Sequence, residues 1–103
     1  MVYSNLPILM ISSAVTSKLQ AKECVEAAMA FAVMRNGANI IFVGNGQQHL
    51  QDTDDSAISS WQAAPLYDAQ LYSLGFNSPE TQPLDHSAFA TLCSQATEDV
   101  VSL

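Results

Sequence analysis

The fold is decided by residues 7–46, which read PILMISSAVTSKLQAKECVEAAMAFAVMRNGANIIFVGNG. Pro7–Ile11 is a short, continuously apolar run, which is typical of a strand buried on both faces of a sheet. A second buried strand is expected at Ala38–Val43, and Gly44-Asn45-Gly46 then breaks it. Two such strands joined by a helix are expected to pair in parallel through a right-handed crossover. The segment therefore predicts a strand–helix–strand unit, the opening of a compact α/β domain.

The segment between the two strands carries the start and stop signals of a helix. Ser17 is followed three residues later by Gln20, which is the pattern of a capping box, and Asn36-Gly37 is a helix stop. The helix is rich in alanine, and its approximate apolar stripe consists of Leu19, Val25, Met29 and Val33, broadened by Ala27, Ala28, Phe31 and Ala32. Residues 28–34 are almost wholly apolar, so we expect this end of the helix to be covered by internal packing or by another subunit.

The remainder of the chain predicts two more helices and two more strands. We expect a polar loop at 47–55, a helix at about 57–64, a strand at 69–74, a loop at 75–83, a helix at about 86–96 capped by Asp85, and a closing strand at 99–103. Residues 1–103 then form one domain with the order β-α-β-α-β-α-β. This order indicates a small three-layer α/β/α domain with a mainly parallel sheet of four to five strands.

The charge of the chain restricts its partners. There are 3 Lys and Arg residues against 10 Asp and Glu residues, a formal net charge of −7. Such a charge repels phosphate backbones and anionic membrane surfaces, so we expect neither nucleic acid nor a membrane as partner. The N-terminus has no basic segment with a cleavage site, and the cysteines form no disulfide framework, so we expect a cytoplasmic protein.

Topology places a candidate binding site where motifs do not. Ligands of open parallel sheets bind beyond the carboxyl ends of the strands. The polar or small residues expected at those ends are Ser12, Ser13, Gly44, Asn45, Gly46 and Ser73. The Gly44–Gly46 turn lacks the third glycine and the following helix of a dinucleotide fingerprint, and residues 12–16 lack the spacing of a P-loop. No cofactor is therefore predicted.

The titratable residues suggest neither a metal centre nor a catalytic group. His49 in a polar loop and His86 at a helix start are not spaced as metal ligands. The acidic cluster of Asp52, Asp54 and Asp55 fits a solvated loop better than a cation site. We predict no metal and no catalytic residue, and an activity other than catalysis is favoured.

Several stretches together resemble the DsrE/DsrF-like family, which includes the TusC-type subunits of sulfur relays. These stretches are ILMISSAV at 8–15 with the Ala-rich helix after it, IIFVGNGQQHL at 40–50, LYDAQLYSL at 66–74 and QPLDHSAFATLCSQATEDVVSL at 82–103. The resemblance covers most of the chain. It implies a homo-oligomer, or a hetero-oligomer of related subunits, in which one subunit type carries a persulfide on a cysteine at the end of the third strand.

At the matching position this chain departs from the sulfur-carrying pattern. Residues 71–75 read LYSLG, where Ser73 is the closest hydroxyl and no cysteine is present. A hydroxyl cannot form a persulfide, so the chain is more similar to the non-catalytic DsrF/TusC-type partner. The segment between the third strand and the last helix is also shorter than the family pattern.

The leading hypothesis is therefore a non-catalytic DsrE/DsrF-like subunit of an oligomeric assembly that serves intracellular sulfur transfer. Two alternatives stay open. One is a small-ligand or nucleotide-binding α/β module that uses the strand ends near Ser12, Ser13 and Asn45. The other is a thiol-based sulfur carrier that uses Cys93 or Cys24, although both lie in predicted helices among apolar neighbours, where a thiol behaves as a small hydrophobe.

Overall fold

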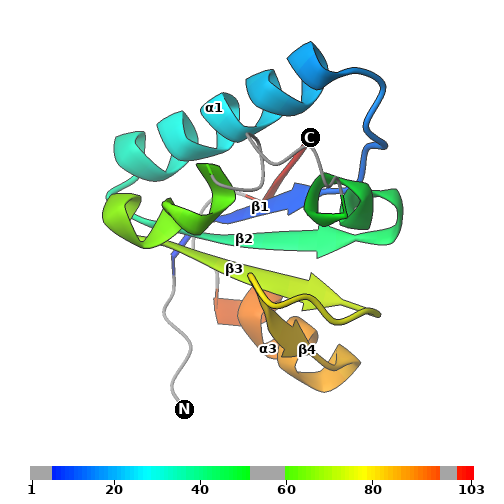
Figure 1. The fold of residues 1–103 in the computed structure, drawn as a ribbon. Coiled ribbons are helices and arrows are strands. Elements are labelled where there is room, and N and C mark those ends of the chain that lie inside the picture. The colour runs from blue at the N-terminus through cyan, green and yellow to red at the C-terminus, as the bar shows by residue number, and fades with distance from the viewer. Residues whose placement is uncertain (1–5, 52–59, 96–99) are drawn as a thin grey trace.

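The protein forms a five-stranded sheet in which every described strand pair is parallel. The structure is a computed structural model that describes residues 6–51, 60–95 and 100–103. The strands are β1 (Ile8–Ile11), β2 (Ala38–Val43), β3 (Ala69–Leu74), β4 (Gln82–Leu84) and β5 (Val100–Ser102). Their order across the sheet is β4-β3-β2-β1-β5 (Figure 1). The predicted α/β fold is confirmed.

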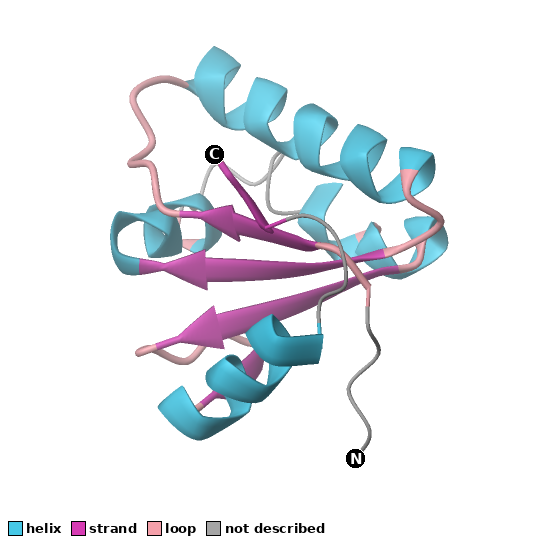
Figure 2. Ribbon diagram, turned by 180° about the vertical axis from the view of Figure 1, so that it is seen from behind, coloured by secondary structure: helices cyan, strands magenta, loops and turns pink. Residues whose placement is uncertain are grey.

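Helices cover both faces of this sheet. Helix α1 (Lys18–Met34) lies on one face, together with the short 3-10 helices η1 (Gly44–Leu50) and η2 (Ala64–Tyr67). Helix α3 (His86–Gln95) lies on the opposite face, as Figure 2 shows. The chain builds the sheet outward from β1 to β4, and then returns through α3 to add β5 on the other side of β1.

The sheet divides the core into two clusters, because successive side chains of a strand point to opposite faces. The cluster facing α1 includes Leu9, Ile40, Phe42, Leu71 and Trp61. The cluster facing α3 consists of Ile8, Ile41, Tyr72, Leu84 and Leu92. Strand β2 contributes to both clusters, and Ala38–Phe42 is buried throughout. This explains why the sequence of β2 is apolar at every position except Asn39 and does not alternate.

The predicted start and end of α1 and the predicted start of α3 are confirmed. The hydroxyl of Ser17 accepts a hydrogen bond from the backbone N–H of Gln20 at 3.0 Å. At the other end of α1, Asn36 and Gly37 both have positive φ angles, and the N–H of Gly37 donates to the carbonyl of Ala32 at 2.8 Å. Asp85 caps α3, because its Oδ1 accepts from the N–H of Ala88 at 2.7 Å.

The predicted apolar stripe of α1 is only partly correct. Val25 and Met29 are buried, but Leu19 and Val33 are exposed. The buried face consists of Ala21, Cys24, Val25, Ala28, Met29 and Ala32. The alanines of this face, Ala28 and Ala32, belong to the predicted broadening of the stripe and are buried with Val25 and Met29.

Two loop predictions are wrong. The predicted loop at 47–55 overlaps η1, which occupies 44–50, and the predicted loop at 75–83 contains the start of β4. Strand β4 has three residues and includes Pro83, which is tolerated because β4 is an edge strand. Of the helix predicted at 57–64, residues 60–62 are helical. Residues 57–59 of this predicted helix, and residues 96–99 between α3 and β5, lie outside the described residues.

Candidate functional site at the carboxyl ends of the strands

Helix η1 closes the carboxyl end of β1. Gly46 lies so close to β1 that a Cβ atom added to it would be 1.9 Å from the carbonyl oxygen of Ile11. No side chain can occupy that space, so glycine is required at this position. Gly44 differs, because a Cβ there would meet nothing within 4 Å, and glycine serves its positive φ of 53°.

Two side chains of η1 bind the loop that follows β1. The carbonyl oxygen of Ser13 lies 3.1 Å from His49 Nε2. A carbonyl can only accept, so Nε2 carries the proton in this bond. The amide oxygen of Gln48 accepts from the N–H of Val15 at 3.2 Å. Helix η1 is thereby fastened across the end of β1.

The last residue of the chain seals the same region from the other side. The N–H of Ser12 donates to the carbonyl of Leu103 at 3.1 Å, and the N–H of Leu103 donates to the carbonyl of Met10 at 2.8 Å. The backbone groups beyond β1, which would be available to a bound anion in an open site, are therefore partly paired within the chain.

His49 is a neutral, buried side chain. Its exposed fraction is 1%. Burial lowers the pKa of His49, because the imidazolium form is poorly solvated there, and the hydrogen bond to Ser13 opposes this effect only in part. With the proton on Nε2, the lone pair of Nδ1 is buried and has no partner among the described residues. The histidine therefore fastens η1 rather than acting as an exposed base.

The six residues predicted for the site differ in their exposure to solvent. Ser12, Gly44 and Asn45 are exposed, and Ser13 is half-buried. Ser73 is completely buried, in register with Phe42, which in turn pairs with Ile11. Its hydroxyl has no hydrogen-bond partner in the described part of the chain. The structure thus brings Ser13, Gly46 and the unpredicted His49 together, and places Ser73 below the surface.

Neither cysteine lies in the environment of an activated thiol. Burial raises the pKa of the Cys24 thiol, which opposes formation of the thiolate. Its neighbours in a shallow hollow of about 250 Å³ include Glu23 and Leu103 but no basic residue. Cys93 is half-buried and packs against the core cluster that faces α3.

The roles of His49 and Gly46 in this region could not be predicted from the sequence. The polar sequence around His49 predicts a loop, although the neighbouring Leu50 is apolar and is buried with it. The sequence around Gly46 predicts only a turn. The spacing Gly44-Asn45-Gly46 was the available signal, because two glycines so close together indicate either a turn or a close backbone approach.

Comparisons with known proteins assign no family. No protein-family model matches the chain, and no curated protein is significantly similar to it. Among the described residues, no helix is long and apolar enough to cross a membrane. In the same part of the chain, no group of three or more His, Cys, Asp or Glu side chains could hold a metal ion.

Proposed function

We propose that this chain is a non-catalytic DsrE/DsrF-like subunit that assembles with copies of itself in an oligomer serving intracellular sulfur transfer, and that a related subunit supplies the reactive cysteine. The sequence resemblance suggests the family. The observation that carries the proposal is an apolar surface that the single chain leaves uncovered, at the end of the sheet where β2 and β3 begin.

This α1–η2 surface consists of Val33, Met34, Leu66 and Tyr67. Met34 is 79% exposed and Leu66 is 84% exposed, while Val33 and Tyr67 are exposed to a smaller degree. The last turn of α1 and helix η2 lie at the same end of the molecule (Figure 1). Exposed apolar side chains that gather on one surface are typical of interaction sites. The sequence predicts that residues 28–34 are covered, but Val33 and Met34 are exposed in the single chain. A second subunit would cover them.

The surroundings of Ser73 and Cys24 agree with a structural role in such an assembly. The residue nearest to the sulfur-carrying position is Ser73, and it is fully buried. Cys24 lies on α1, where burial disfavours its thiolate. A subunit of this kind would contribute surface and stability to the assembly, and the sulfur chemistry would take place on its partner.

A substitution at the α1–η2 surface tests the proposal. Met34→Lys places a charge in the proposed interface, and the dipole of α1 favours a cation at the last turn, so the folded chain itself is not expected to lose stability. We expect light scattering after size exclusion to show an oligomer for the original chain and a monomer for Met34→Lys. Leu19→Lys is the matched control, since Leu19 is 66% exposed at the opposite end of α1.

The outcomes distinguish whether the chain assembles from where its interface lies. An original chain that is strictly monomeric at tens of micromolar contradicts the proposal that it assembles with itself. An oligomer that survives Met34→Lys but dissociates in Leu19→Lys contradicts the choice of surface. Retention of the oligomer in Leu19→Lys alone supports both the assembly and its location.

A further inference from the structure

Among the interactions that hold η1 against the end of β1, one involves a group that can gain a proton. His49 Nε2 donates to the carbonyl of Ser13 at 3.1 Å, next to the bond at 3.2 Å in which the amide oxygen of Gln48 accepts from the N–H of Val15. His49 is the only titratable side chain in Gly44–Leu50. A change in its charge therefore acts directly on the contact between η1 and the segment that follows β1.

The bond to Ser13 decides which ring nitrogen of His49 would receive a second proton. Because a carbonyl only accepts, Nε2 already carries the proton of the neutral ring, and the imidazolium form needs another proton on Nδ1. Nδ1 is buried and has no hydrogen-bond partner in the described part of the chain. The charged ring would therefore combine a buried charge with a buried N–H that has no acceptor, and both are unfavourable.

The segments around His49 offer no charge that offsets this cost. Residues 12–17, which follow β1, carry no titratable side chain. On the α1 side of this segment, Glu23 and Cys24 line a hollow together with Ser13, and His49 does not line it. Burial lowers the pKa of His49, and the bond to Ser13 is the only opposing cause. The closed position thus suits the neutral ring and not the imidazolium.

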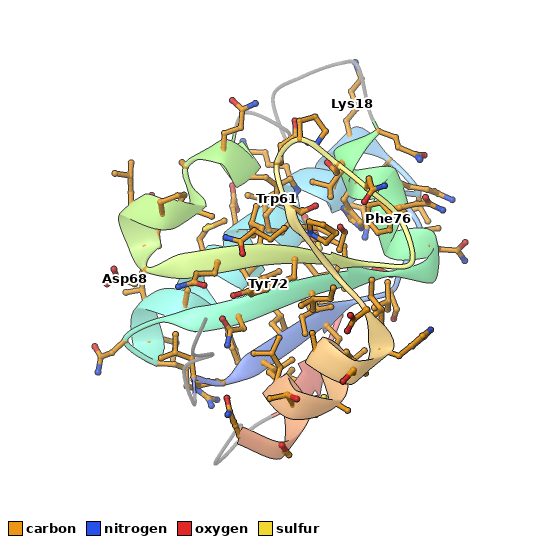
Figure 3. The ribbon with its side chains drawn as sticks, turned by 90° about the horizontal axis from the view of Figure 1, so that it is seen from below. Lys18, Trp61, Asp68, Tyr72 and Phe76 are labelled. Carbon is orange, nitrogen blue, oxygen red and sulfur yellow. The ribbon has the colours of Figure 1, made fainter. Side chains whose placement is uncertain are left out.

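The residue after His49 is anchored by apolar packing that does not titrate. Leu50 is buried in the core cluster that faces α1, to which Trp61 also belongs. Figure 3 shows Trp61 and Phe76 on the side of the sheet away from α3, which is the side of this cluster. The chain beyond η1 is therefore attached to the core independently of the bond to Ser13.

We propose that η1 is a pH-sensitive latch, a segment that closes the carboxyl end of β1 only while His49 is neutral. When Nδ1 takes up a proton, the ring leaves its buried position to hydrate its charge, and the bond to Ser13 is lost. Gly46 then moves away from Ile11, while Leu50 keeps the chain attached to the core. The end of β1 is uncovered, at the place where open parallel sheets bind ligands. This device goes beyond the proposed assembly and does not depend on it.

Hydrogen exchange of backbone amides tests the latch, since it separates local opening from unfolding of the whole chain. Residues 47–50 and Val15 report on η1, and residues 39–42 of β2 report on global unfolding. We expect the protection factors of residues 47–50 to lie below those of β2. We also expect them to fall by about tenfold per pH unit below pH 6.5, because only the open state takes up the proton there.

Two histidine variants provide the comparison. His49→Gln keeps a donor for Ser13 and cannot gain a proton, so we expect residues 47–50 to lose this pH dependence. His86→Gln is the matched control, because His86 is exposed at the start of α3, on the opposite face of the sheet. A measurement on the original chain covers the case in which His49→Gln loosens η1. The nitrogen resonances of the His49 ring should show the proton on Nε2 near neutral pH and should titrate in step with the loss of protection.

Four results overturn the proposal. Protection of residues 47–50 that stays constant below pH 6.5 shows that the latch does not open. Equal protection of residues 47–50 and 39–42 shows that η1 opens only when the whole chain unfolds. A His49 ring that titrates while residues 47–50 stay protected shows that the closed position accepts the imidazolium. Loss of the pH dependence in His86→Gln as well as in His49→Gln shows that His49 is not its source.

Discussion

The two ends of the parallel sheet are built in opposite ways. At the carboxyl ends of the strands, η1 and Leu103 cover β1 with backbone and side-chain hydrogen bonds, and Gly46 leaves no space against Ile11. At the amino ends, the last turn of α1 and η2 expose large apolar side chains, and a cavity opens beside β3. The chain therefore fills the end where parallel sheets usually bind ligands and leaves surface available at the other.

This difference shows how far the residues that follow a strand decide what its carboxyl end can offer. The rule that ligands lie beyond the carboxyl ends of parallel strands assumes that the loops there leave a crevice. In this chain a 3-10 helix takes up that place. The uncovered apolar surface of α1 and η2, which suggests a partner, lies toward the amino ends.

The largest expected effect is at Gly46. Gly46→Ala forces a methyl group onto the backbone of Ile11, so we expect it to lower the free energy of unfolding by about 3 kcal/mol or more. Gly44→Ala is the matched control: it meets open space and costs only the strain of a positive φ, about 1 kcal/mol. Urea unfolding of both variants measures the difference. A greater loss for Gly44→Ala would show that η1 is not pressed against β1.

A smaller effect is expected from the titration of His49. Because burial lowers its pKa in the folded state, the unfolded chain binds more protons than the folded chain below pH 6.5, the ordinary value. His49 therefore contributes full stability above that pH and loses it as the pH falls, by at most about 1.4 kcal/mol per pH unit. His49→Gln keeps a donor for Ser13 and removes the titration. As the pH falls below 6.5, the free energy of unfolding of His49→Gln should change less than that of the original chain. An equal change in the two proteins would contradict a lowered pKa of His49 in the folded state.

Most of the fold could be predicted because it rests on local signals. The strand sequences of β1 and β2, the Ser17 cap and the Asn36-Gly37 stop act within a few residues, and the structure confirms all of them. Strand β4 could not be predicted because it is short and contains Pro83, so its pairing depends on β3 rather than on its own sequence. Helix η1 could not be predicted because its polar residues show no apolar period. The contacts that hold it are made with residues 11–15, which are distant in the sequence.

The candidate site was harder to predict than the fold. The positions of the strand ends followed from the topology, but their closure depends on one missing side chain at Gly46 and one buried bond from His49. The cavity beside β3 had no sequence signal, because the residues that line it, such as Trp61, Leu71 and Glu80, come from separate segments. Sequence patterns describe single elements, whereas a cavity arises where several elements fail to meet.

Hydrogen exchange at two protein concentrations tests the central claim most directly, since it reports on both ends of the sheet in one experiment. The account predicts that raising the concentration slows exchange in residues 30–34 and 64–67, where the α1–η2 surface becomes covered. It predicts no change in residues 12–16 and 44–50, which the chain already closes by itself. Protection that appears at residues 12–16 and 44–50 instead, with none at the α1–η2 surface, would contradict it.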